Sequence, residues 1–161
     1  MAKKDTENET GLKVVVRNRK ASHLYHLLEE YEAGLVLTGT EVKSLRAGKA
    51  SLPESFAEFK GGELFLVGCH INEYSEGNRA NHDPLRDRKL LLSRKEIRRL
   101  QGKVAERGLT LVPLAIYFRE GWAKVKLALA RGKKLYDKRE DLKRRQADRE
   151  TERALRRRDT S

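Results

Sequence analysis

One stretch of the sequence decides how the chain is divided: REGWAKVKLALARGKKLYDKR, residues 119–139. From Trp122 to Arg131 apolar residues alternate with Lys, Ala or Trp, and this period of two is typical of a half-buried β-strand. The pattern ends at Gly132, because residues 132–161 hold twelve Lys or Arg, seven Asp or Glu and only six apolar residues. The sequence therefore predicts a folded body up to residue 131, followed by a basic tail, residues 132–161.

The composition favours a single domain that binds a polyanion. The chain has 161 residues, of which 38% are hydrophobic, and this suits one modest core with extensions. The formal net charge is +12, and the positive surplus extends over the body as well as the tail. Such a charge favours a nucleic-acid partner, although charge can also serve solubility alone.

The sequence also carries signals about location. No apolar run approaches the roughly 18 residues that a membrane span needs, and residues 1–10 lack the apolar centre of a signal peptide. Cys69 is the single cysteine, so an internal disulfide is excluded, in agreement with a reducing compartment. We therefore expect a cytoplasmic protein without a membrane partner.

Local patterns predict short strands and few helices. Residues 1–11 are polar and are expected to be disordered. Gly61-Gly62 separates FAEFK from ELFLV and predicts a β-hairpin over residues 56–67. Further strands are predicted over residues 12–17, 89–92, 109–118 and 122–131, with an edge or bulge at Pro113. This order is typical of a small closed antiparallel barrel, so the fold class is mainly β with a few helices.

Two helices are expected between the strands. The first covers residues 40–48, with Thr40 as its N-cap and Gly48 as its end. The second begins at the capping box Ser93-Arg94-Lys95-Glu96 and ends at Gly108. A third segment, residues 22–33, has Leu24, Leu27, Leu28 and Tyr31 at helical spacing, and the pattern alone predicts a helix there.

The residues that usually carry catalysis or bind metal do not form a recognisable arrangement. The four histidines and Cys69 lack the spacing of a zinc site. We interpret His23 and His26 as hydrogen-bonding residues instead. Neither a phosphate-binding GxxxxGK loop nor a GxSxG nucleophile motif occurs. We therefore predict no enzyme activity, no cofactor and no metal ion.

Cations and aromatic residues are interleaved along the chain in the manner of RNA-binding proteins. Arg79, Arg86, Arg88 and Lys89 lie in or next to a long polar segment, residues 72–88. Lys124 and Lys126 share a predicted strand face with Trp122. RNA-binding proteins combine phosphate contacts with base stacking in this way. A solvated basic face is the alternative interpretation for any one of these residues.

Three separate runs resemble one known family. They are EAGLVLTGTEVKSLRAGKA (residues 32–50), NRANHDPLRDRKLLL (residues 78–92), and LVPLAIYF followed by AKVKLALARGKKLYDKR (residues 111–139). Over residues 14–139 the chain resembles the bacterial SsrA-binding protein family, also called small protein B. The resemblance implies a barrel similar to the oligonucleotide-binding (OB) fold at residues 12–131. It also implies a bent strand, in place of the helix, leading into the EAG motif at residues 32–34.

The family binds the tRNA-like domain of transfer-messenger RNA (tmRNA) and acts with it in trans-translation, which rescues stalled ribosomes. The resemblance therefore implies these partners for this chain, as a monomer bound to RNA. Together with the basic surface it gives a set of expected RNA-binding residues: His23, Glu32, Lys89, Leu91 and Lys124. Some relatives have Asn at the position of Ser93. Serine has the shorter side chain, and here it is also the expected helix cap.

The tail is predicted to be disordered when free and helical on a polyanionic surface. Residues 133–161 contain neither Gly nor Pro and have acid-first i,i+4 pairs, but they lack an apolar stripe that could dock on the body. The resemblance implies that the tail occupies the empty messenger channel of the ribosome, beside the decoding centre. The residues expected to contact ribosomal RNA there are Gly132, Lys133, Lys134, Tyr136, Asp137, Lys138 and Arg139.

Two other functions fit the same composition. A generic single-stranded nucleic-acid-binding OB protein needs a continuous stacking groove and shows little preference for RNA shape. A structural protein of the ribosome is also small, basic and tailed. Selective binding to the tRNA-like domain at moderate salt distinguishes the expected function from the first alternative.

Overall fold

The computed structural model describes residues 12–77, 81–133 and 135–159, except for the side chains of residues 106–107, 135–142 and 157–159. The predicted N-terminal segment 1–11, the loop cation Arg79 and the tail residue Lys134 lie outside the described residues.

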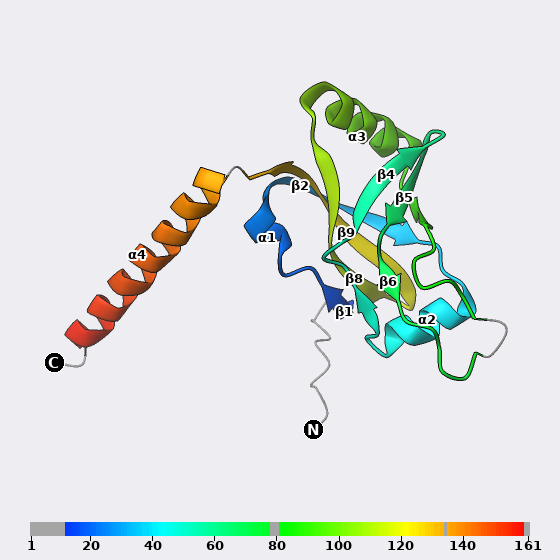
Figure 1. Ribbon diagram of the computed structural model, residues 1–161, viewed down its shortest axis with the longest axis horizontal. Helices are drawn as coiled ribbons and strands as arrows, with labels where there is room; N and C mark the ends of the chain where they lie inside the picture. The colour runs from blue at the N-terminus through cyan, green and yellow to red at the C-terminus, as the bar shows by residue number, and fades with distance from the viewer. Residues whose placement is uncertain (1–11, 78–80, 134, 160–161) are drawn as a thin grey trace.

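Seven strands form one antiparallel sheet, with the hydrogen-bonded order β1-β8-β4-β5-β7-β2-β9. Figure 1 shows these strands gathered in the body of the protein. Strand β9 also pairs with β8, so β8 has three hydrogen-bonded neighbours, β1, β4 and β9. The seven strands are β1 (Leu12–Arg17), β2 (Tyr25–Leu35), β4 (Phe56–Lys60), β5 (Glu63–Val67), β7 (Arg88–Leu91), β8 (Thr110–Arg119) and β9 (Trp122–Gly132). Two further short strands, β3 (Ala50–Ser51) and β6 (His70–Ile71), pair with each other. The described fold is therefore mainly β, which confirms the predicted class.

The hairpin of β8 and β9 contains the first part of the stretch that divides the sequence, residues 119–132. It closes at the pair Arg119 and Trp122, through a turn in which Glu120 has φ 51° and Gly121 has φ 84°. Positive φ at both central residues defines a turn whose twist matches that of the strands. The left-handed conformation costs a non-glycine residue such as Glu120 about 1–2 kcal/mol. The register shifts between Pro113 and Ala115, so the predicted irregularity at Pro113 is a bulge.

Residues 21–35 show where the helical pattern fails. Only one turn, α1 (Ala21–Leu24), is helical, and β2 begins at Tyr25. Strand β2 pairs with β9 along most of its length and shifts register between Leu27 and Glu29. Leu27 and Leu28 are both exposed, so the apolar residues at helical spacing do not form one buried face. The helix predicted from the pattern alone is wrong, and the strand implied by the family resemblance is confirmed.

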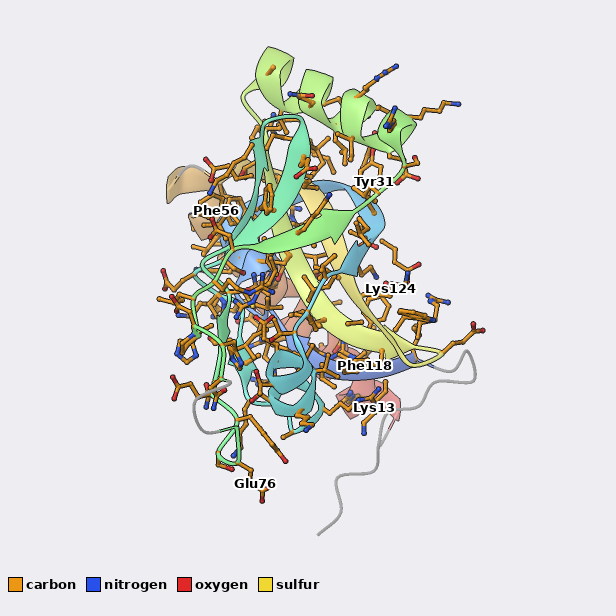
Figure 2. All side chains as sticks on the ribbon, turned by 90° about the vertical axis from the view of Figure 1, so that its right-hand side faces the viewer. Lys13, Tyr31, Phe56, Glu76, Phe118 and Lys124 are labelled. Carbon is orange, nitrogen blue, oxygen red and sulfur yellow. The ribbon has the colours of Figure 1, made fainter. Side chains whose placement is uncertain are left out.

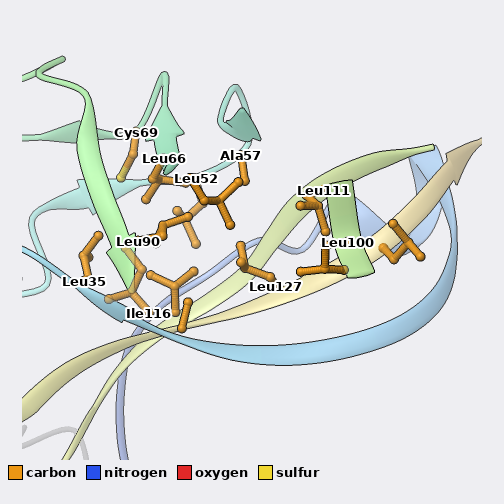
Figure 3. Close-up of a cluster of buried hydrophobic side chains, with 14 of the residues drawn as sticks. Leu35, Leu52, Ala57, Leu66, Cys69, Leu90, Leu100, Leu111, Ile116 and Leu127 are labelled. Atoms are coloured by element: carbon orange, nitrogen blue, oxygen red, sulfur yellow. The ribbon is translucent and has the colours of Figure 1, made fainter. Parts of the chain in front are cut away.

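The core lies between the strands, and α3 (Arg94–Arg107) adds Leu100 to it (Figure 3). Val125, Leu127 and Leu129 of β9 all belong to this core, as their alternation predicts. Ala128 on the opposite face is also buried, in a smaller cluster with Val112 and Ala130. Burying a leucine side chain contributes about 1.5–3 kcal/mol, so β9 is a main source of the body's stability.

The helix boundaries are partly as predicted. Helix α3 follows Ser93, whose hydroxyl accepts from the Glu96 amide at 3.2 Å, and ends before Gly108, which has φ 62°. Helix α2 (Gly39–Arg46) follows Thr38, so the prediction of Thr40 as its N-cap is wrong. The Thr40 hydroxyl instead lies 2.9 Å from Nδ1 of His82, a contact between residues 42 positions apart that no local pattern reveals.

The tail forms a helix, α4 (Leu135–Asp159), which extends away from the body in Figure 1. Its described side chains, those of residues 143–156, are all exposed. The prediction that the tail is disordered when free is therefore not confirmed. The helix agrees with the local sequence, because acid-first i,i+4 pairs favour helix without any packing against the body.

Candidate nucleic-acid interface

The pairing of charges shows which cations of the body remain available to a ligand. Seven acidic side chains among the described residues form ion pairs with Lys or Arg: Glu29, Glu30, Glu32, Glu41, Glu58, Glu63 and Asp87. Cations of the body without an ion pair inside the described part of the chain are Lys13, Arg17, Arg19, Lys20, Lys43, Arg46, Lys49, Arg94, Lys95, Arg98, Arg99, Lys124 and Arg131. The body therefore carries uncompensated positive charge suited to a polyanion.

Glu32 is held by two donors from β8. The Tyr117 hydroxyl donates to Oε1 of Glu32 at 2.7 Å, and Nε of Arg119 donates to the same oxygen at 2.9 Å. Partial burial acts to raise the pKa of Glu32, but these two hydrogen bonds outweigh it and lower the pKa below its ordinary value. Burial and the acceptor Glu32 together raise the pKa of Tyr117 to about 12. Glu32 is therefore an ionised acceptor in a fixed orientation.

One oxygen of Glu32 remains for another donor. Both donors bind Oε1, and none of the residues described in the structure donates to Oε2. Glu32, Tyr117 and Arg119 also line a cavity of about 330 Å³, together with Arg17 and Lys126. A carboxylate in this setting can accept from the edge of a base, a contact that carries sequence or shape information.

Three of the expected RNA-binding residues meet at Gly34. This glycine of β2 pairs with Leu91 of β7 on one side and with Lys124 of β9 on the other. A Cβ atom at Gly34 would lie 3.2 Å from Cβ of Leu91, so glycine permits the close approach of the two strands. Glu32 is two residues away on the same face of β2. Figure 2 shows Lys124 extending outward from the sheet.

The other two expected residues lie differently. Lys89 shares a strand face with Leu91, but its ammonium group lies 3.0 Å from the carboxylate of Glu63. His23 is exposed on α1, beside a cavity that is also lined by Tyr25 and Phe56. His23 precedes the start of β2, where Tyr25 pairs with Gly132 of β9, whereas Gly34 near the end of β2 pairs with Lys124. The structure therefore does not bring His23 into the cluster around Gly34.

The expected tail residues begin inside the body. Gly132 is the last residue of β9 and pairs with Tyr25. The amide of Lys133 donates to the Leu24 carbonyl at 3.0 Å, and its ammonium group donates to the Ser22 carbonyl at 2.9 Å. Of the remaining residues, the side chains of Lys134, Tyr136, Asp137, Lys138 and Arg139 lie outside the described part of the structure.

One group of charged residues has a different role from the one predicted. Arg88 is completely buried and donates to Glu41, which is also completely buried, and to the carbonyl of Cys69. Arg86 donates to the other oxygen of Glu41 at 2.6 Å. Burial acts to raise the pKa of Glu41, but hydrogen bonds from Arg86, the Thr38 amide and Arg88 lower it to about 2. These two arginines therefore hold the loop to α2. The assignment of the fully buried Arg88 to an RNA-binding surface is wrong, whereas the side chain of Arg86 is 37% exposed and its assignment stays a prediction.

The comparisons with known proteins agree on one family. The family model for the SmpB protein matches residues 15–157. The SsrA-binding protein of Salinispora arenicola is 61% identical over 150 residues, which cover 93% of this chain and 94% of the relative. That of Desulforudis audaxviator is 61% identical over 144 residues, 89% of this chain and 94% of the relative.

A solved structure is also similar. It is described as "tmRNA-SmpB: a journey to the center of the bacterial ribosome", with a TM-score of 0.63, 60% identity, and coverage of 74% of this chain and 85% of that chain. The fold and its uncompensated cations define a small basic β protein with a helical tail. This chain belongs to the SmpB family. None of the helices described here is both long and apolar enough to cross a membrane.

Proposed function

We propose that this protein binds the tRNA-like domain of tmRNA and acts with it on stalled ribosomes in trans-translation. Its family, and relatives that are themselves named SsrA-binding proteins, support the RNA partner. The observation that carries the proposal is the meeting of Glu32, Leu91 and Lys124 around Gly34, on a body with uncompensated positive charge.

The three side chains have distinct chemical roles in the proposed interface. Lys124 has no ion-pair partner among the described residues and meets a phosphate of the RNA. Glu32 accepts from a base edge or a ribose hydroxyl through Oε2, because Tyr117 and Arg119 already occupy Oε1. Phosphate contacts supply affinity for any RNA, whereas the oriented carboxylate discriminates between RNAs.

The architecture around this surface is an OB-like barrel of residues 12–131. The pairing of β8 with both β4 and β9 supports closure, because the hydrogen-bonded order then returns to a strand it has already included. Closure removes strand edges that otherwise pair with other chains. His23, at the other end of β2, and Lys89, on the face of Leu91, extend the interface beyond Gly34.

The tail is the proposed ribosome-binding element, in the messenger channel next to the decoding centre. Its exposed helical side chains and excess of Lys and Arg support a polyanionic partner. In this proposal the protein acts in the cytoplasm, as a monomer on its RNA, and binds RNA without catalysing a reaction.

A competition experiment tests the function. The full chain is titrated with the tRNA-like domain and with an unstructured RNA of equal length, at moderate salt where non-specific electrostatic binding weakens. We expect clear preference for the tRNA-like domain. Equal affinity for both RNAs would identify a generic single-strand binder, and binding to ribosomes without any dependence on tmRNA would identify a ribosomal structural protein.

A further inference from the structure

The folded body extends further along the chain than the sequence pattern indicates. Strand β9 pairs with β2 as far as Gly132, which lies opposite Tyr25. Gly132 has no left-handed φ, and a Cβ atom there would meet nothing within 4 Å beyond its chain neighbours, so the strand passes through it without a special conformation. The amide of Lys133 then donates to the Leu24 carbonyl at 3.0 Å and joins the end of β9 to α1. Gly132 and Lys133, which the sequence pattern assigns to the tail, are therefore part of the body.

The side chain of Lys133 makes a second contact with α1. Its ammonium group donates to the Ser22 carbonyl at 2.9 Å. The last carbonyls of a helix lack an intrahelical partner, and a cation is a favourable donor to them. We call these two hydrogen bonds, to the carbonyls of Leu24 and Ser22, the Lys133 clamp. They come from the backbone and the side chain of one residue, so together they fix its orientation as well as its position.

Helix α1 is itself held firmly by the body. Ala21 at its start is 2% exposed. Asn18, in the turn before α1, donates from its amide to the Leu114 carbonyl at 2.8 Å and from Nδ2 to the Pro113 carbonyl at 2.9 Å. At its other end α1 continues directly into β2. A residue that is bonded to α1 is therefore bonded to a fixed part of the body.

We propose that Lys133 is a positioning residue, which clamps the base of the tail to α1 and so sets the direction in which α4 leaves the body. Figure 1 shows α1 beside the end of β9, where the chain continues into α4. The proposal rests on the proposed function, because the direction matters to a tail that must enter a ribosomal channel while the body holds the tRNA-like domain. Lys133 then acts through the tail, and its ammonium group is committed to Ser22 in place of a phosphate.

Three substitutions of Lys133 should have graded effects. Lys133→Met keeps the aliphatic stem and the backbone amide but removes the donor to Ser22. The ratio of clamped to unclamped chains should then fall about two- to fivefold, which is the usual contribution of a cation at a helix C-terminus. Lys133→Arg retains a cationic donor and should behave as the wild-type chain does. Lys133→Pro also removes the amide donor and should have the largest effect.

Distances between two spin labels measure the direction of α4 in the full chain without any RNA. The labels are attached at Gln101→Cys in α3 and Gln146→Cys in α4, which are both exposed positions. Cys69 is buried, and burial raises the pKa of its thiol to about 11, so it stays unlabelled at neutral pH. We expect one narrow main distance in the wild-type chain. In Lys133→Met the ratio of this main population to the remainder should fall about two- to fivefold.

A matched control separates positioning from charge. Lys143 is an exposed cation of α4, and Lys143→Met removes the same charge as Lys133→Met but leaves the Lys133 clamp in place. The control should leave the distances unchanged and reduce the salt slope of ribosome binding by about one. Lys133→Met should leave that slope and the affinity for free tmRNA unchanged, yet lower tagging on stalled ribosomes about two- to fivefold.

Failure of this inference differs from failure of the proposed function. A broad distance distribution already in the wild-type chain, or an unchanged distribution in Lys133→Met, would overturn the Lys133 clamp as the determinant of the tail's direction. A salt slope that then falls as it does in Lys143→Met would identify Lys133 as an RNA contact. A wild-type chain that shows the narrow distance but neither binds tmRNA nor supports tagging would contradict the proposed function and leave the Lys133 clamp intact.

Discussion

The hydroxyl of Tyr117 donates to the carboxylate of Glu32 at 2.7 Å, although their strands, β8 and β2, do not pair with each other. Both strands pair with β9, and Tyr117 lies opposite Lys124 while Glu32 lies opposite Lys126. The hydrogen bond therefore spans β9 and fixes the carboxylate close to the lysines on that strand. The position of the Glu32 carboxylate thus depends on three strands, β2, β8 and β9.

Tyr117→Phe should raise the pKa of Glu32 toward its ordinary value. The variant removes one of the two donors that lower this pKa, and it leaves Arg119 in place. Tyr117 is buried, and phenylalanine fills nearly the same volume, so the fold should be retained. An NMR titration of the Glu32 carboxyl measures the effect, and the same variant should discriminate less between cognate and unrelated RNA. An unchanged pKa would show that Arg119 alone determines the charge of Glu32.

Lys124→Gln should weaken binding to the tRNA-like domain and reduce the slope of log affinity against log salt by about one. Lys126→Gln is the matched control on the same strand, because Lys126 already lies 3.0 Å from the carboxylate of Glu30. We expect the control to change the slope less. Titrations at three salt concentrations give both slopes. Equal slopes for the two variants would show that Lys124 contributes no more to phosphate binding than Lys126 does.

Arg88→Met should destabilise the body by about 3–5 kcal/mol, because it leaves the buried Glu41 carboxylate without the one arginine partner that is itself completely buried. The double variant Glu41→Leu with Arg88→Met should recover part of this loss, since it removes both buried charges. Urea unfolding measures the free energies. Equal stability of the single variant and the wild-type chain would show that water or Arg86 replaces Arg88 at no cost.

The same carboxylate predicts an acid-dependent loss of stability. The pKa of Glu41 is about 2 in the folded chain, below its ordinary value of 4.5, so ionised Glu41 stabilises the fold above pH 4.5. This contribution decreases as the pH falls from 4.5 through about 2. Stability of the Glu41→Gln variant should vary less with pH across this range, as measured by urea unfolding at each pH. An identical pH dependence in both proteins would assign the acid sensitivity to other carboxyl groups.

Truncation after Lys133 should preserve binding to free tmRNA and abolish tagging on stalled ribosomes. The cut belongs after Lys133, because this residue bonds to α1 through both its amide and its ammonium group. A translation reaction stalled on a message without a stop codon measures tagging. A tail of the same composition in scrambled order is the control, and tagging restored by that tail would reduce the tail's role to its charge.

Local signals predicted the elements whose causes are local. Gly61 and Gly62 have φ 58° and 80°, as the hairpin requires, and Ser93 and Gly108 bound α3 as expected. The helix predicted at residues 22–33 is wrong beyond Leu24 because pairing with β9 outweighs a local preference. The family resemblance, which reflects the whole fold, favoured the strand.

The candidate site was predictable in part. Glu32, Leu91 and Lys124 came from the resemblance, and the structure brings them together through register pairs that no window of sequence contains. Arg88 looked like any other cation of a basic loop, because its partner Glu41 is 47 positions away and nothing in either segment marks the pair. Burial of a charge is decided by tertiary packing, so composition and spacing do not reveal it.

The pair of Glu41 and Arg88 also restricts how the family's sequences can diverge. Loss of either residue alone leaves the other charged and buried, so a lineage that replaces one must replace both, through an intermediate of low stability. Both positions are then expected to drift slowly for reasons of folding. Conservation of these two positions among relatives would therefore be insufficient grounds for calling either residue an RNA contact.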